Sequence, residues 1–354
     1  MTEAPIRVGI AGTGTIANQR HIEGWREAGA EVVAAADVFP GRAARFAAKW
    51  KVPAAYESVA DMLSGSDLQV VSICVPPYAH RDVAVACLDA GKHIYLEKPS
   101  AMNEAETVEI TEAAHRVGKL IMTGSNSVYS PQIQTAKRYI DAGNLGTVYF
   151  VKSVSDRRRG TARGWFREKA FGGGGVGMDT GSHSIDRVLF LLGAPKPVSV
   201  TATTFRNFPT YIPARSYSSV GIAEGVENDV PEADVEDMLV AMVRFENDVT
   251  ATFENTWIAN MEGGNGVWIY GTKAGLSLND GMVYGETEDH LLTDTKLTYP
   301  QGTGRHTEAF AAFIECIRAN RETQSPGERG IIAMRILDAI YASAAQGGKQ
   351  IVFD

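Results

Sequence analysis

Short apolar runs alternate with amphipathic stretches through the first third of the chain. The apolar runs predict strands at residues 6–11, 31–36, 68–75, 93–96 and 120–123, and the stretches between them predict helices at 41–50, 59–63, 81–90 and 104–117. Asn103 is expected to cap the last of these helices, with Glu106 three residues further on. Such alternation at short spacing is typical of βαβ units, so this part of the chain predicts a doubly wound parallel sheet, an α/β fold.

The pattern changes after Asn126. Helices are expected at 132–142, 176–193, 307–319 and 329–345, and strands at 148–154, 198–205, 238–245, 249–257 and 267–270. The short connection at 246–248 indicates a hairpin. The sequence therefore predicts two domains, a dinucleotide-binding domain over 1–126 and an α+β domain with a largely antiparallel open sheet over 127–354. Residues 210–236 show little periodicity and are expected to form a long loop, a candidate lid or interface arm.

A glycine-rich turn joins the first predicted strand to a helix. Gly12 permits a tight turn, Gly14 leaves room for a pyrophosphate, and Ala17 is small enough for close packing of the helix on the strand. Asp37 ends the second strand, where its carboxylate is placed to accept hydrogen bonds from a ribose and to repel a 2′-phosphate. Arg42 is the nearest cation. The turn therefore predicts a dinucleotide site that takes NAD rather than NADP.

Lys98 follows the predicted strand 93–96, at the edge of the sheet where open α/β sheets bind ligands. A lysine at the end of a buried strand needs an anionic partner or solvent. It either pairs with Glu97 or reaches solvent, or it faces the nicotinamide crevice and stabilises a substrate oxygen.

The predicted helix 176–193 has two different faces. Its apolar stripe is formed by Met178, Ile185, Val188, Leu189 and Leu192. Asp179, His183 and Arg187 fall opposite that stripe, and Asp179 and His183 are four residues apart, so their side chains adjoin. This face is either solvated, with Asp179 as a capping residue, or functional. The glycine-rich run at 172–177 favours function, because it allows close backbone contact with a ligand.

These segments together resemble the glucose–fructose oxidoreductase / inositol dehydrogenase (Gfo/Idh/MocA) family along nearly the whole chain. The resemblance is carried by residues 12–17, 76–80, 91–99, 124–126 and 173–175, and by Asp179 followed by His183. It implies a Rossmann domain, a C-terminal open-sheet domain often used for oligomerisation, and hydride exchange between a nicotinamide and a hydroxyl carbon of a polyol or sugar. One departure is the segment Ser127–Pro131, where many members carry an arginine and a phenylalanine.

The resemblance also implies the residues of the site. The catalytic set is Lys98, which stabilises the alkoxide, His183, the general base, and Asp179. The cofactor-binding residues are Gly12, Thr13, Gly14, Thr15, Ile16, Asp37, Val75, Pro76, His80, Glu97, Lys98 and Asn126, and the substrate-binding residues are Lys98, Tyr129, Arg158, Trp165, Asp179 and His183. The run Arg157–Arg159, with Arg163 and Arg167 near it, is either a solvated loop or oligomer contact, or it supplies an arginine that holds substrate hydroxyls, a phosphate or a carboxylate.

Composition restricts the remaining possibilities. The 354 residues carry a net charge of −8, which argues against a nucleic-acid or anionic-membrane partner. No apolar run has membrane-spanning length, and the three cysteines show no metal or redox spacing, so a reducing cytoplasmic setting is expected. No metal is expected, because Asp186 points to the side of Asp179 and His183.

Three classes of function remain. The leading one is a cytoplasmic NAD-dependent dehydrogenase of a cyclic polyol, sugar or sugar derivative, forming a homo-oligomer (dimer or tetramer) through the C-terminal sheet. The alternatives are an NAD-dependent glycosidase that oxidises its substrate transiently, and a non-catalytic dinucleotide-binding regulator.

Overall fold

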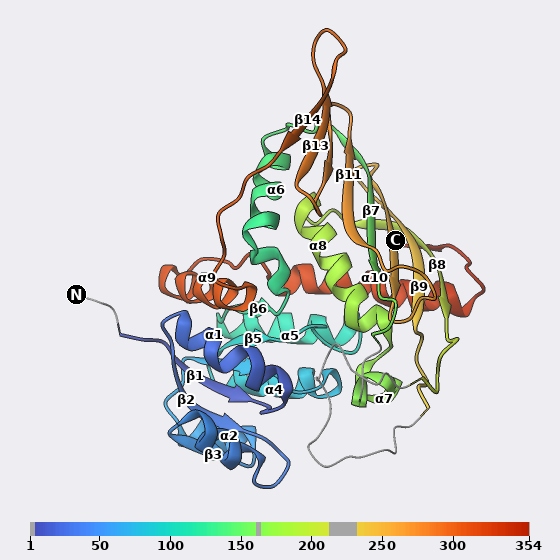
Figure 1. Ribbon diagram of the computed structural model, residues 1–354. Coiled ribbons are helices and arrows are strands. Elements are labelled where there is room, and N and C mark those ends of the chain that lie inside the picture. The colour runs from blue at the N-terminus through green and yellow to red at the C-terminus, as the bar shows by residue number, and fades with distance from the viewer. Residues whose placement is uncertain (1–3, 161–163, 212–231, 354) are drawn as a thin grey trace.

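The computed structural model describes residues 4–160, 164–211 and 232–353, which form two sheets one above the other (Figure 1). The lower sheet has six parallel strands in the order β3-β2-β1-β4-β5-β6. Its strands are β1 (Arg7–Ala11), β2 (Glu31–Ala36), β3 (Ala54–Tyr56), β4 (Val70–Ile73), β5 (His93–Leu96) and β6 (Ile121–Thr123). This is the doubly wound α/β order, with the chain reversing direction across the sheet between β1 and β4, so the fold prediction is confirmed.

Helices on both faces bury this sheet. They are α1 (Ile22–Glu27), α2 (Arg42–Trp50), α3 (Val59–Gly65), α4 (His80–Asp89) and α5 (Glu104–Val117). The Asn103 side chain accepts from the Glu106 N–H, which confirms the predicted cap. A π-helical turn, Ala17–His21, precedes α1 and was not expected from the sequence; it carries His21 into the core, where it is fully buried.

The upper sheet has nine strands in the order β14-β13-β12-β11-β7-β10-β9-β8-β15. They are β7 (Val148–Asp156), β8 (Pro197–Phe205), β9 (Met238–Phe245), β10 (Thr250–Thr256), β11 (Asn265–Gly271), β12 (Gly275–Ser277), β13 (Met282–Glu286), β14 (Leu292–Lys296) and β15 (Ile351–Val352). Among the described strand pairs of this sheet, only β7–β10 is parallel, which confirms the largely antiparallel prediction. The hairpin between β9 and β10 is also confirmed.

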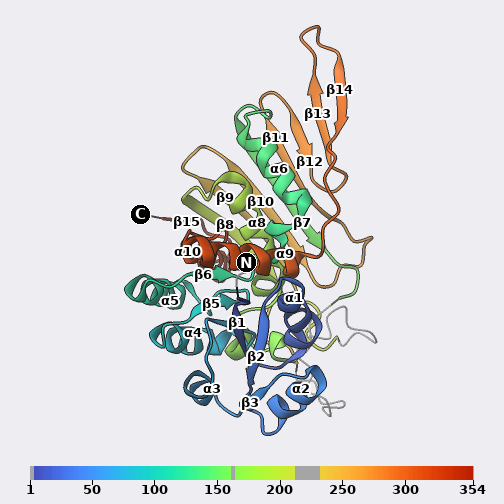
Figure 2. The same cartoon turned by 90° about the vertical axis from the view of Figure 1, so that its left-hand side faces the viewer.

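Four longer helices complete the C-terminal part: α6 (Pro131–Asp141), α8 (Ser182–Leu192), α9 (Arg305–Ala319) and α10 (Gly327–Ala345). Figures 1 and 2 show α6, α8 and α10 on one side of the nine-stranded sheet, and α9 and α10 between this sheet and the lower one. Phe310 of α9 stacks on Trp25 of α1 with ring centroids 4.2 Å apart. The end of the chain therefore completes the core of the first domain.

The last strand of the lower sheet ends at Thr123, and the first strand of the upper sheet begins at Val148. The predicted domain boundary after residue 126 falls between them. The predicted loop 210–236 lies largely outside the described residues. No described helix is long and apolar enough to cross a membrane.

Candidate active site

The turn after β1 passes very close to the end of β4. Gly12 has a φ of +89°, and a Cβ there would lie 2.9 Å from the backbone of Cys74 and Val75. A side chain at this position would be both strained and blocked. A Cβ on Gly14 would meet no atom within 4 Å, so Gly14 faces open space. This geometry fits a pyrophosphate placed against Gly14 and the N-terminus of the helix that follows.

Asp37 is held in place by the same turn. Its Oδ2 accepts from both the N–H and the hydroxyl of Thr13, each at 2.9 Å, and its Oδ1 accepts from the Phe39 N–H at 3.0 Å. Arg42 lies 3.7 Å from Oδ1. The carboxylate is therefore fixed at the carboxyl end of β2, where the ribose of a dinucleotide lies in this fold.

Glu97 is buried against His21 rather than free to contact a ligand. His21 Nε2 donates to Glu97 Oε1 at 2.9 Å, and His21 Nδ1 lies 2.8 Å from Ser72 Oγ, which accepts from Trp25. Burial works to raise the pKa of Glu97, but the hydrogen bond and charge of His21 together with the charges of His306 and Lys98 outweigh it, and the pKa falls to about 2. Glu97 thus stays ionised behind Lys98.

One group of side chains in the described ranges has metal-ligand chemistry. The ligand atoms of His21, Glu97 and His306 all lie within 4.8 Å of one another. The hydrogen bonds of His21 to Ser72 and Glu97 account for this arrangement without an ion, and His306 Nε2 lies 2.8 Å from the side-chain amide of Asn126. The group therefore connects the two domains beneath the site.

His80 also has internal partners. Its Nδ1 lies 2.9 Å from the Pro99 carbonyl oxygen and its Nε2 lies 2.8 Å from the Val75 carbonyl oxygen. Burial lowers the pKa of His80, although both carbonyl contacts oppose that shift. His80 therefore ties the loop after β4 to the loop after β5, and it holds Val75, Pro76 and Lys98 in position rather than facing a ligand itself.

Lys98 meets Asp179 across the two domains. Its Nζ donates to the Asp179 Oδ1 at 3.2 Å and to the Asp179 carbonyl oxygen at 3.1 Å, and both side chains are largely buried. The ammonium pairs with Asp179 of the other domain and not with the Glu97 side chain, and its expected contact with a substrate oxygen stays a prediction. The ammonium is fixed at the carboxyl end of β5, in the crevice where ligands bind in this fold.

Two residues that the sequence did not single out for this role hold the Asp179 carboxylate. The Trp257 Nε1–H, just after β10, donates to Asp179 Oδ2 at 2.9 Å, and the Arg157 guanidinium, just after β7, lies 3.8 Å from the same oxygen. Burial works to raise the pKa of Asp179, but Lys98, Arg157 and the Trp257 hydrogen bond outweigh it and hold the pKa below its usual range. Asp179 is therefore an ionised group in a fixed orientation.

His183 lies one turn after Asp179, as predicted. Burial and then the charge of Lys98 lower its pKa well below the usual value, with Asp179 opposing the shift. The imidazole is therefore neutral at pH 7. Its Nδ1 is buried and has no hydrogen-bond partner among the described residues. A neutral imidazole with a free ring nitrogen is suited to accept a proton.

The glycine run at residues 172–177, before α8, packs against protein groups rather than leaving room for a ligand as expected. A Cβ on Gly175 would lie 2.0 Å from the Glu236 carbonyl oxygen, and one on Gly174 would lie 2.1 Å from the Tyr341 hydroxyl. Glu236 accepts from the N–H groups of Gly175 and Gly177 and from Tyr341 at 2.9–3.0 Å. The expectation of close contact with a ligand is wrong for these glycines. They let the backbone wrap around a buried carboxylate at the start of the π-helical turn Gly177–Gly181, which carries Asp179.

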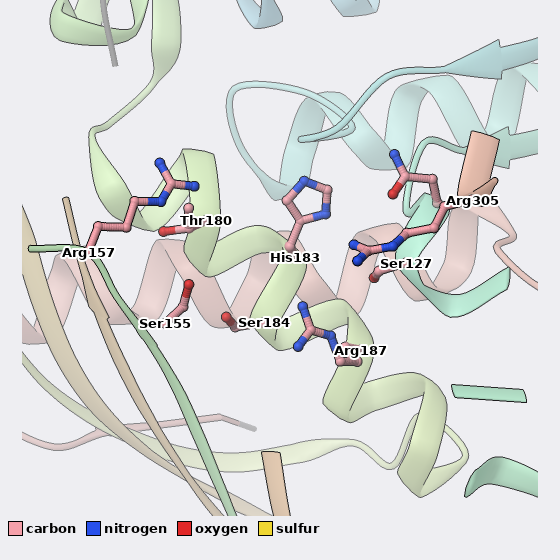
Figure 3. Close-up of a pocket in the computed structure, with 9 residues that line it drawn as sticks. Ser127, Ser155, Arg157, Thr180, His183, Ser184, Arg187 and Arg305 are labelled. Atoms are coloured by element: carbon pink, nitrogen blue, oxygen red, sulfur yellow. The ribbon is translucent and has the colours of Figure 1, made fainter. Parts of the chain in front are cut away.

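A cavity of about 160 Å³ opens beside His183. Figure 3 shows Arg157 and Arg305 reaching toward His183 from opposite sides, with Arg187 next to it on the same helix. The remaining lining residues are small and polar: Asn126, Ser127, Ser155, Thr180 and Ser184. This volume is below the roughly 300–1,000 Å³ of sites for drug-sized ligands, so the cavity suits a small polar molecule.

Several predicted substrate contacts do not line this cavity. Arg158 is exposed and does not line the cavity, whereas its neighbour Arg157 does. Tyr129 is buried in the core, and burial raises the pKa of its phenol. Trp165 stacks on Phe166 with ring centroids 3.8 Å apart, and Phe166 lies under the Lys98 ammonium. Arg163 lies outside the described residues.

Two family models match the chain over most of its length. The model described as an oxidoreductase family with an NAD-binding Rossmann fold matches residues 6–125, and that of the GFO/IDH/MocA C-terminal domain matches residues 133–277. The first domain is accordingly an NAD-binding Rossmann domain, as predicted.

Similar proteins cover the chain from end to end. D-glucoside 3-dehydrogenase of Escherichia coli (strain K12) is 28% identical over 352 residues, 98% of this chain and 97% of its own length. Inositol 2-dehydrogenase of Rhizobium meliloti (strain 1021) is 24% identical over 349 residues, 96% of this chain and 97% of its own. Among solved structures, levoglucosan dehydrogenase in complex with NADH and levoglucosan superposes with a TM-score of 0.82 at 21% identity, covering 99% of both chains. At that identity the structure shows a shared fold.

Proposed function

The chain belongs to the Gfo/Idh/MocA family of oxidoreductases, and from this we propose that it is an NAD-dependent dehydrogenase of a secondary hydroxyl carbon in a cyclic polyol, sugar or sugar derivative. Relatives named as glucoside, levoglucosan and inositol dehydrogenases support the substrate class. The observation that carries the proposal is the pairing of Lys98 with Asp179, one helical turn before His183, which lines a small polar cavity.

His183 is the general base of the proposed reaction. In this proposal a substrate hydroxyl in the cavity donates a hydrogen bond to the imidazole, which takes the hydroxyl proton as the carbon is oxidised. The low pKa keeps the imidazole unprotonated before the reaction, and Asp179 next to it stabilises the imidazolium that forms.

Lys98 stabilises the alkoxide that develops on the substrate oxygen. Its ammonium is desolvated and already oriented by Asp179, so it needs no reorganisation as negative charge develops. Asp179 in turn compensates the lysine charge when no substrate is bound, and Trp257 and Arg157 fix its carboxylate.

The residues of the β1 turn fit the dinucleotide. Gly12, Thr13 and Gly14 would hold the pyrophosphate with Thr15 and Ile16 at the start of the helix, and Asp37 would hold the ribose. Bound NAD supplies a hydride acceptor at the nicotinamide ring. Val75, Pro76 and Asn126 lie around the same crevice and are proposed to enclose that ring.

A second copy of the chain is the proposed partner. Strand register places Met242, Lys152 and Trp268 in one row, and Phe150 and Tyr270 in the next, on the face of the nine-stranded sheet opposite α8. Met242 and Tyr270 are exposed, and exposed apolar side chains on a sheet face indicate a surface that another protein covers. We propose a homo-oligomer through this face.

The test is a spectrophotometric screen of polyols and sugars for net NADH formation, followed by the substitutions Lys98→Met and His183→Ala. Each substitution is expected to reduce kcat by at least about a hundredfold while NADH binding persists. Wild-type turnover in both variants would contradict the proposal. A glycosidase would release sugar without net NADH, and a regulator would bind NADH and turn over none of the panel.

A further inference from the structure

The cavity beside His183 has an unusual charge balance. Among the described residues, its lining includes the guanidinium groups of Arg157, Arg187 and Arg305 and no carboxylate. Asp186, the acidic neighbour of Arg187, turns away and pairs with Arg329 at 2.7 Å. The Asp179 carboxylate does not line the cavity, and it is already held by Lys98 and Trp257.

Arg187 lacks the partners that other buried arginines have. Arg329 donates to both Asp186 oxygens and to the Ser325 hydroxyl. The Nε of Arg187 is buried without a hydrogen bond, and no carboxylate within the described part of the chain pairs with Arg187 or Arg305. A desolvated cation without a counter-ion is costly, and a second cation beside it adds to that cost. Burial and then the charge of Arg305 lower the pKa of Arg187, and the charge of Asp186 opposes that shift without cancelling it.

The position of Arg187 relative to His183 determines which part of a bound substrate Arg187 could contact. The two residues are four apart on α8, so their side chains lie one turn apart on the same face. A substrate whose hydroxyl contacts His183 would present to Arg187 a group on another carbon, across a single sugar ring. Arg157 is less available, because it donates to the Gly160 carbonyl oxygen and faces Asp179.

We propose that Arg187 and Arg305 bind an anionic group of the substrate, so that this enzyme acts on a sugar or polyol carrying a carboxylate or a phosphate ester. Guanidinium groups bind both anions through paired hydrogen bonds, which gives geometric selectivity as well as affinity. The small serine and asparagine side chains around them would meet the neutral hydroxyls. This inference rests on the proposed function, since it uses His183 as the place where the reacting hydroxyl lies.

The experiment compares matched neutral and anionic sugars. Calorimetry on the protein saturated with NADH would measure the binding of D-glucose, D-glucuronate, D-galacturonate, D-gluconate and D-glucose 6-phosphate, at low and high salt. The same titrations on Arg187→Met and Arg305→Met test the two guanidiniums. Arg305 is exposed, so its replacement leaves the core untouched, and Arg158→Met is the matched control, since it removes an exposed arginine outside the cavity.

We expect at least one anionic sugar to bind about tenfold or more tightly than glucose, with an advantage that shrinks in high salt. Most of that advantage should disappear in Arg187→Met and Arg305→Met and remain in Arg158→Met. Tighter binding of the sugar carboxylates than of glucose 6-phosphate would identify the anionic group as a carboxylate, and the reverse would identify it as a phosphate ester. Equal binding of glucose and all anions, or an advantage that survives both cavity variants, would overturn the inference.

A parallel assay of NADH formation separates this inference from the proposed function. Anion binding that depends on Arg187 without NADH formation from any sugar would contradict the dehydrogenase and leave the anion site standing. NADH formation from neutral sugars alone would confirm the dehydrogenase and overturn the anion site.

Discussion

The indole N–H of Trp257 donates to the Asp179 carboxylate at 2.9 Å, although the two residues come from a strand end and from a helix N-terminus. The same carboxylate accepts from Lys98 of the other domain at 3.2 Å. By holding Oδ2 of Asp179, Trp257 therefore orients Oδ1 toward the Lys98 ammonium.

Trp257→Phe tests this relationship. The ring remains in the core while the donor is lost, so kcat should fall by about ten- to a hundredfold, equivalent to ~1.5–3 kcal/mol for a hydrogen bond to a charged group. NADH affinity should change little, because Trp257 lies in the other domain. Steady-state kinetics on any substrate found in the screen would measure the effect, with Trp268→Phe on the exposed sheet face as control. An equal loss in both variants would mean that Asp179 does not depend on the indole.

The pH dependence of kcat/KM reports on His183. The base must be unprotonated, and burial together with Lys98 lowers its pKa below 6.5. The rate should therefore remain constant from pH 8 down to at least 6.5 and fall only at lower pH. A profile that already declines between pH 8 and pH 7 on the acid side would contradict the neutral imidazole.

Asp37→Asn should change the choice of cofactor. The amide oxygen can still accept from Thr13, but the charge that repels a 2′-phosphate is removed while Arg42 remains 3.7 Å from that position. We expect the ratio of NADPH to NADH affinity to rise by about tenfold, equivalent to ~1.4 kcal/mol. Fluorescence titration of both reduced cofactors measures it. An unchanged ratio would mean that the carboxylate charge does not select NAD.

Gly175→Ala tests the structural account of the glycine run. Its Cβ would meet the Glu236 carbonyl oxygen at 2.0 Å, so the backbone must shift, at a cost of about 1–3 kcal/mol and a melting temperature lower by several degrees. Gly264→Ala is the control, because a Cβ there meets nothing within 4 Å. Circular dichroism melts would compare the two. An unchanged melting temperature in Gly175→Ala would contradict the close packing of Gly175 against Glu236.

Tyr270→Glu tests the proposed sheet interface. A charge on this exposed face should oppose burial against a second copy, and the protein should shift toward monomer in sedimentation velocity experiments. Glu288→Gln, in the turn after β13, serves as a change of charge away from that face. A wild-type protein that is already monomeric would contradict the proposal outright.

The local pattern of hydrophobic and polar residues was enough to predict most helices and strands. The predicted strands 31–36 and 238–245 match β2 and β9 residue for residue, because buried strands between clear breaks leave few alternatives. The strands β3 and β12–β15 were missed, since short strands with mixed polarity have a weak periodic signal. The π-helical turns were also missed, because they shift the register of a helix without a sequence signal of their own.

The sequence by itself determined the doubly wound domain, the dinucleotide turn and the candidates Lys98, Asp179 and His183, because each depends on residues close together in the chain. Only the tertiary structure decided which distant groups surround them: His21 against Glu97, Trp257 and Arg157 on Asp179, and Arg305 beside Arg187. Arg187 was visible on the polar face of its helix, yet the absence of a paired carboxylate among the described residues was not. The direction of a side chain and the charge around it depend on packing between segments that are far apart in sequence, and local periodicity carries no information about that packing.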